Sequence, residues 1–328
     1  MKAIVFEAPG DPEVLHLAEV PDPTPGPEHL LVRVRATALN RADTLQRRGL
    51  YPPPPGESEI LGLELAGEVE AVGEATQGFR PGDRVFGLVG GGAYAEKALL
   101  HYRMAMPIPA GWSFVEAAAV PEVFFTANET LFTLGGLQPG ETVLIHAGAS
   151  GVGTAGIQMA HYIGARVLVT AGSAAKITRT LELGADAGIN YKEEDFAARV
   201  LELTEGVGVD LIQDFIGAAY WERNLRCLKE AGRLVLVGLM GGAKVEADLG
   251  LIMRKRLHII GSVMRSQPLA NKIAITQRFR ERWLPLLAQG ILRPVIDRTF
   301  PLAEAAAAHR YMEENRNIGK IVLVVDGA

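Results

Sequence analysis

Residues 142–156, TVLIHAGASGVGTAG, join an apolar segment to a glycine-rich turn. The first five residues suit a buried strand, and an amphipathic helix is expected over 151–163. In this pattern Gly151 allows the tight turn, Gly153 lets the backbone approach a pyrophosphate, and Gly156 permits close packing of helix on strand. The N-terminus of such a helix offers free N–H groups to phosphates. The pattern predicts a dinucleotide-binding turn, and an ordinary strand–helix turn is the alternative.

Apolar strands alternate with helical segments on either side of this turn. Strands are expected at 142–146, 166–170, 209–214 and 233–237, and helices at 151–163, 174–183 and 220–228. Alternation of this kind, with strands that are apolar throughout, is typical of a parallel sheet covered by helices on both faces. The central part of the chain is therefore predicted to be an α/β domain of the doubly wound Rossmann type.

The flanking segments have a different character. Apolar residues alternate with charged ones in 32–36 and 68–72, which suits half-buried strands. The proline cluster at 51–56 can be neither a helix nor a central strand. A long helix is expected over 270–288 and a last strand over 320–325. Short strands with frequent turns indicate a compact, mainly β module.

Composition limits the kind of protein. The 328 residues favour two domains, and the net charge of −5, with 33 basic and 38 acidic residues, offers no footprint for nucleic acid or an anionic membrane. No signal peptide or membrane-spanning apolar run is expected, so the prediction is a soluble, cytoplasmic protein. The single cysteine, Cys227, excludes an internal disulfide and is expected to be buried and unreactive.

The end of the second expected strand bears on which dinucleotide binds. An NAD-preferring site places an acidic residue there to hold the ribose 2′-hydroxyl. Residues 170–176 read TAGSAAK, and no carboxylate occurs before Glu182. A 2′-phosphate would meet Ser173 and the Lys176 cation instead, beside Gly172, and a hydrogen bond to a charged group contributes about 1.5–3 kcal/mol. We therefore predict NADPH as the cofactor; for Lys176 alone, a solvated helix charge is the ordinary alternative.

Five further segments resemble one known family. They are ALNRAD at 38–43, GLELAG at 62–67, PGDRV at 81–85, GAYAE at 92–96 and IGKIV at 318–322. With the glycine turn, they make the chain similar, from end to end, to the medium-chain dehydrogenase/reductase superfamily in its zinc-free quinone oxidoreductase branch. The resemblance implies a GroES-like β domain formed by residues 1–124 and 267–328, and a Rossmann NADPH-binding domain at 125–266. It also implies a homodimer, paired near residues 259–262.

The zinc alcohol dehydrogenases of this superfamily have ligands that this chain lacks. They carry a cysteine near the 40–43 segment, a histidine where this chain has Leu63, and four cysteines in a structural lobe. Asn40, Leu63 and a single cysteine cannot replace them, so no metal is expected. A metal commonly stabilises the alkoxide when an alcohol is oxidised, whereas a quinone is electrophilic enough to accept hydride without one. The absence therefore predicts metal-free reduction of a small-molecule quinone or enone.

The resemblance also carries residue roles. Asn40 and Tyr51 would line the catalytic cleft near the nicotinamide, and a surface aromatic residue of the turn is the less favoured alternative for Tyr51. Tyr191 would lie beside the 2′-phosphate with Lys176, or else be an ordinary tyrosine at a strand end. The expected cofactor contacts are Thr126, Ser150, Gly151, Val152, Gly153, Gly156, Gly172, Ser173, Lys176, Tyr191, Leu239, Met240, Gly241, Val263, Arg265 and Asn317.

These observations lead to three hypotheses for the function. The first is an NADPH-dependent quinone oxidoreductase that transfers hydride without a metal. The second is an NADPH-dependent reductase of α,β-unsaturated carbonyl compounds, and the third is an NADPH-binding protein with little catalysis. Among residues outside the expected site, His146 is predicted to be buried and Asp214 to make a structural hydrogen bond at the end of its strand.

Overall fold

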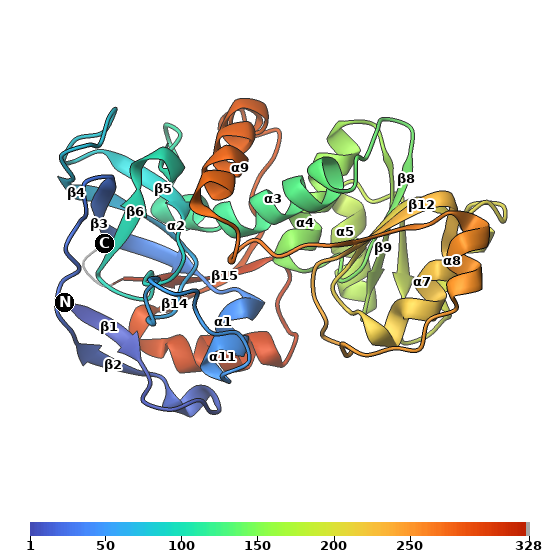
Figure 1. Ribbon diagram of the computed structural model, residues 1–328, viewed down its shortest axis with the longest axis horizontal. Helices are drawn as coiled ribbons and strands as arrows, with labels where there is room; N and C mark the ends of the chain where they lie inside the picture. Colours follow the sequence, from blue (N-terminus) through green and yellow to red (C-terminus); the bar gives the residue numbers. More distant parts are fainter. Residues whose placement is uncertain (326–328) are drawn as a thin grey trace. The chain divides into compact units, whose positions relative to one another are not determined.

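The computed structural model describes residues 1–325, which form two compact units (Figure 1). Unit 1 is built from residues 1–125 and 265–328, and unit 2 from residues 126–264. Unit 2 is a single continuous stretch of chain, whereas unit 1 is assembled from two stretches that are distant in sequence. Each unit has its own sheet.

Unit 2 contains a six-stranded parallel sheet with the order β10-β9-β8-β11-β12-β13. Its strands are β8 (Thr142–Ile145), β9 (Arg166–Ala171), β10 (Ala187–Asn190), β11 (Val209–Asp214), β12 (Leu228–Leu236) and β13 (His258–Gly261). Its helices are η3 (Asn128–Thr133), α4 (Gly151–Tyr162), α5 (Ala174–Glu182), α6 (Phe196–Leu203), η4 (Ala218–Tyr220), α7 (Trp221–Cys227) and α8 (Leu249–Lys255). The predicted doubly wound α/β fold is confirmed, because the sheet is parallel throughout.

Both faces of this sheet are buried, as the uniformly apolar strands predict. Successive residues of a strand point to opposite faces. Leu144 and Leu168 therefore belong to one buried cluster with Phe196 of α6. Their neighbours Val143 and Val167 belong to a second cluster, on the other face, which includes residues of α4. Burying a large aliphatic side chain stabilises a fold by about 1.5–3 kcal/mol, so these strands are held on both sides.

Unit 1 contains a seven-stranded sheet in which β14, β15, β3, β4, β5 and β7 follow one another and β6 also pairs with β3. Its strands are β3 (His29–Ala38), β4 (Glu64–Val72), β5 (Arg84–Leu88), β6 (Lys97–His101), β7 (Met106–Pro107), β14 (Ile296–Pro301) and β15 (Lys320–Val324), with β1 (Lys2–Val5) and β2 (His16–Glu19) forming a separate hairpin. Its helices are η1 (Pro12–Val14), α1 (Arg41–Arg47), η2 (Tyr102–Met104), α2 (Phe114–Ala118), α9 (Leu269–Arg282), α10 (Leu284–Ala288), η5 (Leu302–Glu304) and α11 (Ala305–Glu313), and α3 (Pro121–Ala127) crosses from unit 1 into unit 2.

The pairing of β3 with β15 brings together residues that are far apart in sequence. Val322 lies opposite Ala38 in an antiparallel register, and the Leu39 N–H donates to the Ile321 carbonyl at 2.9 Å. The start of β4 lies beside the same place, since the Thr37 hydroxyl donates to the Glu64 carbonyl at 2.6 Å. The end of β3 and the starts of β4 and β15 therefore meet at one point of the sheet.

The long helix predicted over residues 270–288 is wrong in one respect. The structure has α9 and α10, which are separated at Trp283. Pro285 lies in the first turn of α10, where its missing N–H costs nothing, but it could not lie inside a continuous helix. The predicted helix at 220–228 ends one residue earlier, because Leu228 begins β12.

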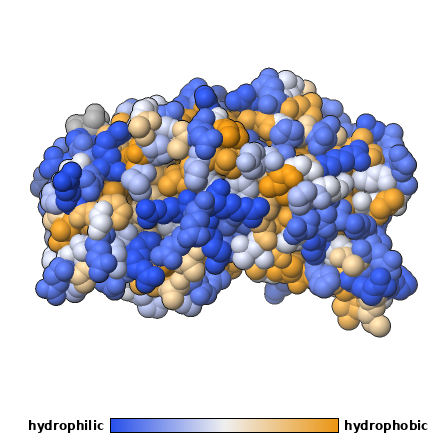
Figure 2. Space-filling model, turned by 90° about the horizontal axis from the view of Figure 1, so that it is seen from above, coloured by the Kyte–Doolittle hydropathy of each residue, from blue (hydrophilic) through white to orange (hydrophobic). Residues whose placement is uncertain are grey.

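The surface and the helix lengths complete the description. Among residues 1–325, no helix is long and apolar enough to cross a membrane. The face shown in Figure 2 mixes hydrophilic and hydrophobic residues, with the hydrophobic ones in scattered groups. Exposed apolar side chains in unit 2 include Leu249 and Met253 of α8.

Candidate active site

The glycine turn of unit 2 connects β8 to α4 as the sequence predicts. The Ser150 hydroxyl caps the helix by accepting from the Gly153 N–H at 3.0 Å. A Cβ on Gly153 would lie only 2.5 Å from the Gly148 carbonyl oxygen, so no other residue fits there without a shift of the turn. Gly156 lies against Leu131 and Ile145, where a Cβ would approach to 3.2–3.3 Å. The turn thus exposes the N-terminus of a twelve-residue helix, α4, at the carboxyl end of β8.

A second polar group lies at the carboxyl ends of β9 and β10, which are neighbours in the sheet. Ser173 caps α5, whose first turn contains no acidic residue and has Lys176 at its third position. The Tyr191 hydroxyl would lie 2.7 Å from a Cβ on Gly172, so this tyrosine covers Gly172. The Lys192 side chain reaches the same glycine at 3.3 Å from that Cβ position. Lys192 is not among the residues predicted for this site, although it follows Tyr191 directly in the sequence.

A cation in the first turn of a helix is electrostatically unfavourable, because the positive end of the helix dipole lies there. Lys176 occupies that position in α5, and the Lys192 side chain lies against Gly172, just before this helix. An anion bound at the start of α5 would relieve the repulsion. This part of unit 2 therefore suits a phosphate group and would repel a second cation.

The remaining predicted cofactor residues of unit 2 lie in loops and at the start of the unit. The loop after β12 is tied to the loop after β11, since Met240 N donates to the Phe215 carbonyl at 3.1 Å and Gly241 N to the Ile216 carbonyl at 2.7 Å. Leu239 and Met240 are exposed, as is Val263 after β13. Thr126 is buried and its carbonyl accepts from the Thr130 hydroxyl at 2.6 Å.

In unit 1, Asn40 lies at the junction of β3, β4 and β15 and is buried. Its amide nitrogen donates to Glu64 Oε1 at 2.8 Å, and its amide oxygen accepts from Lys320 Nζ at 2.7 Å. Lys320 also donates to Glu64 Oε1 at 2.7 Å and to the Leu39 carbonyl at 2.7 Å. Lys320 is 3% exposed and Glu64 is 0% exposed. Both polar ends of Asn40 are therefore fixed by a buried ion pair, which sets the orientation of its amide group.

A chain of hydrogen bonds runs from Asn40 through buried side chains to His309. Asp43 accepts from the Asn40 N–H at 2.7 Å, from the Gly62 N–H at 3.3 Å and from the Tyr94 hydroxyl at 3.3 Å. The Tyr94 oxygen lies 3.2 Å from His309 Nε2. Burial raises the pKa of Asp43 to about 6, and the hydrogen bonds from the Asn40 and Gly62 N–H groups and the Lys320 charge oppose this shift. A buried carboxyl group with this raised pKa is therefore hydrogen-bonded to the backbone of Asn40.

Arg47 fixes the tautomer of His309. The guanidinium can only donate, and its Nη1 lies 3.1 Å from His309 Nδ1, so Nδ1 accepts and Nε2 carries the proton. Burial and then the Arg47 charge lower the pKa of His309 to about 3. Arg47 is itself fully buried and pairs with Glu313 at 2.7 Å. The sequence offered little sign of this set beyond single charged residues in apolar surroundings.

Tyr51 lies in the proline-rich loop and is partly buried. The guanidinium carbon of Arg265 lies 5.5 Å from the centre of its ring, and Arg265 Nη1 donates weakly to the Tyr51 carbonyl at 3.4 Å. Burial raises the pKa of the Tyr51 phenol; the Arg265 charge opposes this, and the Glu122 charge adds to it. The Glu122 N–H in turn donates to Glu64 Oε2 at 2.8 Å. Tyr51, Arg265 and the Asn40 junction are thus linked within unit 1.

Four other predicted residues lie outside these groups. The Asn317 amide donates to the Gly319 carbonyl at 2.7 Å, just before β15, so the last segment does return to the sheet of unit 1. Cys227 is buried, and burial raises the pKa of its thiol to about 12. His146 is buried between Thr170 and Asn224, and Asp214 accepts from the N–H groups of Ile216 and Gly217. The structural roles predicted for the last three residues are confirmed.

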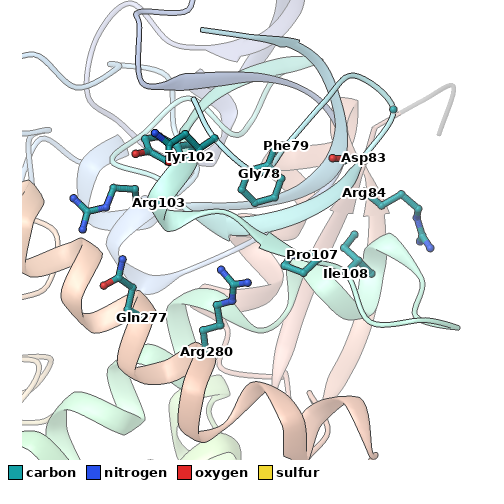
Figure 3. Close-up of a pocket in the computed structure, with 12 residues that line it drawn as sticks. Gly78, Phe79, Asp83, Arg84, Tyr102, Arg103, Pro107, Ile108, Gln277 and Arg280 are labelled. Atoms are coloured by element: carbon teal, nitrogen blue, oxygen red, sulfur yellow. The ribbon is translucent and has the colours of Figure 1, made fainter. Parts of the chain in front are cut away.

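An open groove elsewhere in unit 1 contains none of the predicted residues (Figure 3). Its volume is about 750 Å³, and Arg84, Arg103, Arg280, Tyr102 and Gln277 contribute to its lining. In the described part of the chain, no buried side-chain atom without a partner belongs to a residue of this groove. This distinguishes the groove from the region around Tyr51 and Arg265, where Arg265 Nη2 is buried without a partner among the described residues.

Two stretches of the chain match known families. Residues 26–110 match the alcohol dehydrogenase GroES-like domain and residues 151–286 the zinc-binding dehydrogenase family. The chain belongs to the medium-chain dehydrogenase/reductase superfamily, of which these two domains are the parts. Among the described residues there is no group of three or more histidine, cysteine, aspartate or glutamate side chains that could hold a metal ion.

Within the superfamily, its relatives include quinone oxidoreductases. A quinone oxidoreductase of Pseudomonas aeruginosa is 38% identical over 98% of this chain and 99% of its own length. The structure of the Escherichia coli quinone oxidoreductase complexed with NADPH superposes with a TM-score of 0.91, at 32% identity, and covers 99% of this chain and 100% of that one. A structure described as an NAD-dependent alcohol dehydrogenase is also similar, with a TM-score of 0.88 at 36% identity, covering 99% and 100%.

Proposed function

We propose that this protein reduces quinones with NADPH, by hydride transfer and without a metal. The observation that carries the proposal is the full-length similarity to a quinone oxidoreductase, at 38% identity. Two features support this cofactor: the N-terminus of α4 suits a pyrophosphate, and Tyr191 and Lys192 lie against Gly172, just before the first turn of α5 with Lys176. NADPH, when bound, supplies the hydride. The chain's own residues bind and orient both reactants and exclude water from them.

The choice of NADPH over NADH rests on the end of β9. An acidic residue that would hold the 2′-hydroxyl is missing from the first turn of α5, and two lysines lie near it. The similarity to a structure named for NAD dependence makes this the point to test first. Purified protein should oxidise NADPH with 1,4-benzoquinone or a naphthoquinone much faster than NADH at equal concentrations.

Lys176→Ala tests the cofactor assignment directly. Because a hydrogen bond to a charged group contributes about 1.5–3 kcal/mol, the KM for NADPH should rise about ten- to a hundredfold. The KM for NADH should stay nearly the same. Arg179→Ala is the matched control, since Arg179 is on the same helix and pairs with Glu182 on the surface. Equal rates with both cofactors in the unaltered protein would refute the 2′-phosphate assignment.

Reduction rates measured with a panel of quinones and α,β-unsaturated ketones distinguish between the remaining hypotheses. Faster reduction of α,β-unsaturated ketones than of quinones would favour the enone reductase. Tight NADPH binding without turnover of any acceptor would indicate a binding protein.

We also propose a homodimer that pairs along β13. This strand is at the edge of the sheet of unit 2, with β12 on one side only. An open strand edge is a template for pairing with a second chain.

A further inference from the structure

Arg265 has one nitrogen without a hydrogen-bond partner inside the protein. The side chain is 7% exposed. Its Nε donates to the Gly90 carbonyl at 2.9 Å and its Nη1 weakly to the Tyr51 carbonyl at 3.4 Å. The Nη2 atom is buried and has no partner among the described residues. Leaving a buried charged donor unsatisfied is destabilising, so a hydrogen-bond acceptor is expected at this position.

The nearby carboxylates do not supply that acceptor. The charges of Asp43 and Glu57 both act on Arg265, but neither forms a bond with it that the structure shows. Asp43 already accepts three hydrogen bonds, from Asn40, Gly62 and Tyr94. Glu57 is paired with Lys272 at 3.0 Å. Neither carboxylate satisfies Nη2, which leaves this nitrogen available to a bound molecule.

The surroundings define what that molecule presents. The guanidinium lies over the Tyr51 ring, which belongs to the proline-rich loop. A planar compound that lies beside Tyr51 and directs an oxygen at Nη2 fits both groups. Carbonyl and phenolate oxygens meet this requirement, and a charge-assisted hydrogen bond from arginine is stronger to an anionic oxygen than to a neutral one.

We propose that Arg265 Nη2 donates to the carbonyl oxygen of the acceptor and stabilises the negative charge that develops there. This inference rests on the proposed function. Hydride transfer brings two electrons and one proton to a quinone, converts NADPH to NADP⁺, and leaves a hydroquinone monoanion with its charge on oxygen. Arg265 holds that oxygen while a proton from water completes the hydroquinone. Sequence resemblance assigns Arg265 to the cofactor, whereas this assignment makes it a catalytic residue that touches the acceptor.

Kinetics of Arg265→Ala test the assignment. Removing one donor to a developing oxyanion lowers turnover about 10²–10³-fold, so kcat/KM for a naphthoquinone should fall by that factor. The Kd for NADPH, followed by its fluorescence, should change less than twofold. Added guanidinium chloride at millimolar concentration should restore part of the activity of Arg265→Ala. Arg84→Ala is the matched control, since Arg84 also donates to a backbone carbonyl and stacks on a ring, that of Phe114.

A binding experiment without turnover provides a second readout. 4-Nitrophenol is a redox-inert analogue of the hydroquinone anion, and its phenolate has its own visible absorption. Bound to the NADP⁺ complex, it should ionise at lower pH than in water, and this shift should disappear in Arg265→Ala. Arg265→Lys should keep part of it.

The outcomes separate the two proposals. If the unaltered protein reduces no quinone but still shifts the ionisation of 4-nitrophenol through Arg265, the proposed function fails and the oxyanion site stands. An Arg265→Ala protein with unchanged kcat/KM and an unchanged nitrophenol shift would overturn the inference. So would a rise in the NADPH Kd as large as the loss of kcat/KM, because Arg265 would then serve the cofactor.

Discussion

The buried pair of Lys320 and Glu64 makes a sharp prediction about stability. Lys320→Met removes the ammonium group and leaves the Glu64 carboxylate, which is fully buried, without its counter-charge. Breaking a buried pair by removing one partner costs about 3–5 kcal/mol. The free energy of unfolding of unit 1 should fall by about that amount. Glu64→Gln should be costly for the same reason, since it strands the ammonium.

The double variant decides whether the charge is responsible. In Lys320→Met with Glu64→Gln, neither charge remains, and replacing a buried pair by neutral groups is often close to neutral. The double variant should therefore lose less stability than the sum of the two single variants, by about 2 kcal/mol or more. The single variant Lys320→Met and the double variant both lose the hydrogen bonds from Lys320 to Asn40 and Leu39. The free energy of these bonds therefore cancels when the variants are compared.

Tryptophan fluorescence in urea measures this effect in unit 1 alone. The three tryptophans are Trp112, Trp221 and Trp283, and only Trp221 belongs to unit 2. All variants are made in a Trp221→Phe background, so the signal comes from unit 1.

The control cycle is Arg80→Met with Asp83→Asn, a surface pair in the same unit with Arg80 86% exposed. Its coupling should be below about 0.5 kcal/mol. Strictly additive losses at Lys320 and Glu64 would refute the reasoning.

Three further predictions concern unit 2. Gly153→Ala places a Cβ 2.5 Å from a carbonyl oxygen and should weaken NADPH binding at least tenfold by fluorescence titration, whereas Gly261→Ala, which meets no atom within 4 Å, should not. His146 has a pKa of about 4, below its ordinary 6.5, because it is buried; its contribution to stability is complete above pH 6.5 and is lost as the pH falls towards 4. The free energy of unfolding, measured in urea at pH 7, 6 and 5, should therefore decrease less with falling pH in His146→Gln than in the unaltered protein. Equal decreases in the two proteins would contradict this. The Ser262 N–H donates to the Leu236 carbonyl of β12, and N–H groups alternate between the two edges of a strand, so the Ile259 N–H faces the open edge of β13. Ile259→Pro removes this donor and should convert a dimer into a monomer of 35.2 kDa, as measured by light scattering. An unchanged mass would exclude β13 as the interface.

The parts of the fold that local sequence determines could be predicted. The glycine turn could be placed because its requirements, a preceding apolar strand and a following helix, lie within about twenty residues. The two-sided burial of the parallel sheet followed from the apolar strands in the same way. The break between α9 and α10 was also visible in principle, because Pro285 stands in the middle of the predicted helix.

The polar junction of unit 1 could not be predicted, because it depends on contacts between distant segments. Asn40 and Lys320 are 280 residues apart, and nothing in either neighbourhood shows that one fixes the other. Arg265 was predicted as a site residue by resemblance. That its Nη2 has no partner among the described residues depends on the positions of the Tyr51 and Gly90 carbonyls, which accept from its other two nitrogens. Such a gap in the hydrogen bonding is visible only when the packing is known.

The divided chain of unit 1 has a consequence for the order of events during synthesis. Unit 2 is continuous, so all of its strands have been made when residue 264 leaves the ribosome. Unit 1 cannot complete its sheet until Lys320 and β15 have been synthesised, because β3 until then lacks its partner strand and Glu64 lacks its counter-charge. A nascent chain that stops before β15 should expose the unpaired edge of β3 and be a target for chaperones and proteases. The completion of unit 1 thus depends on β15, a strand that is synthesised after the whole of unit 2.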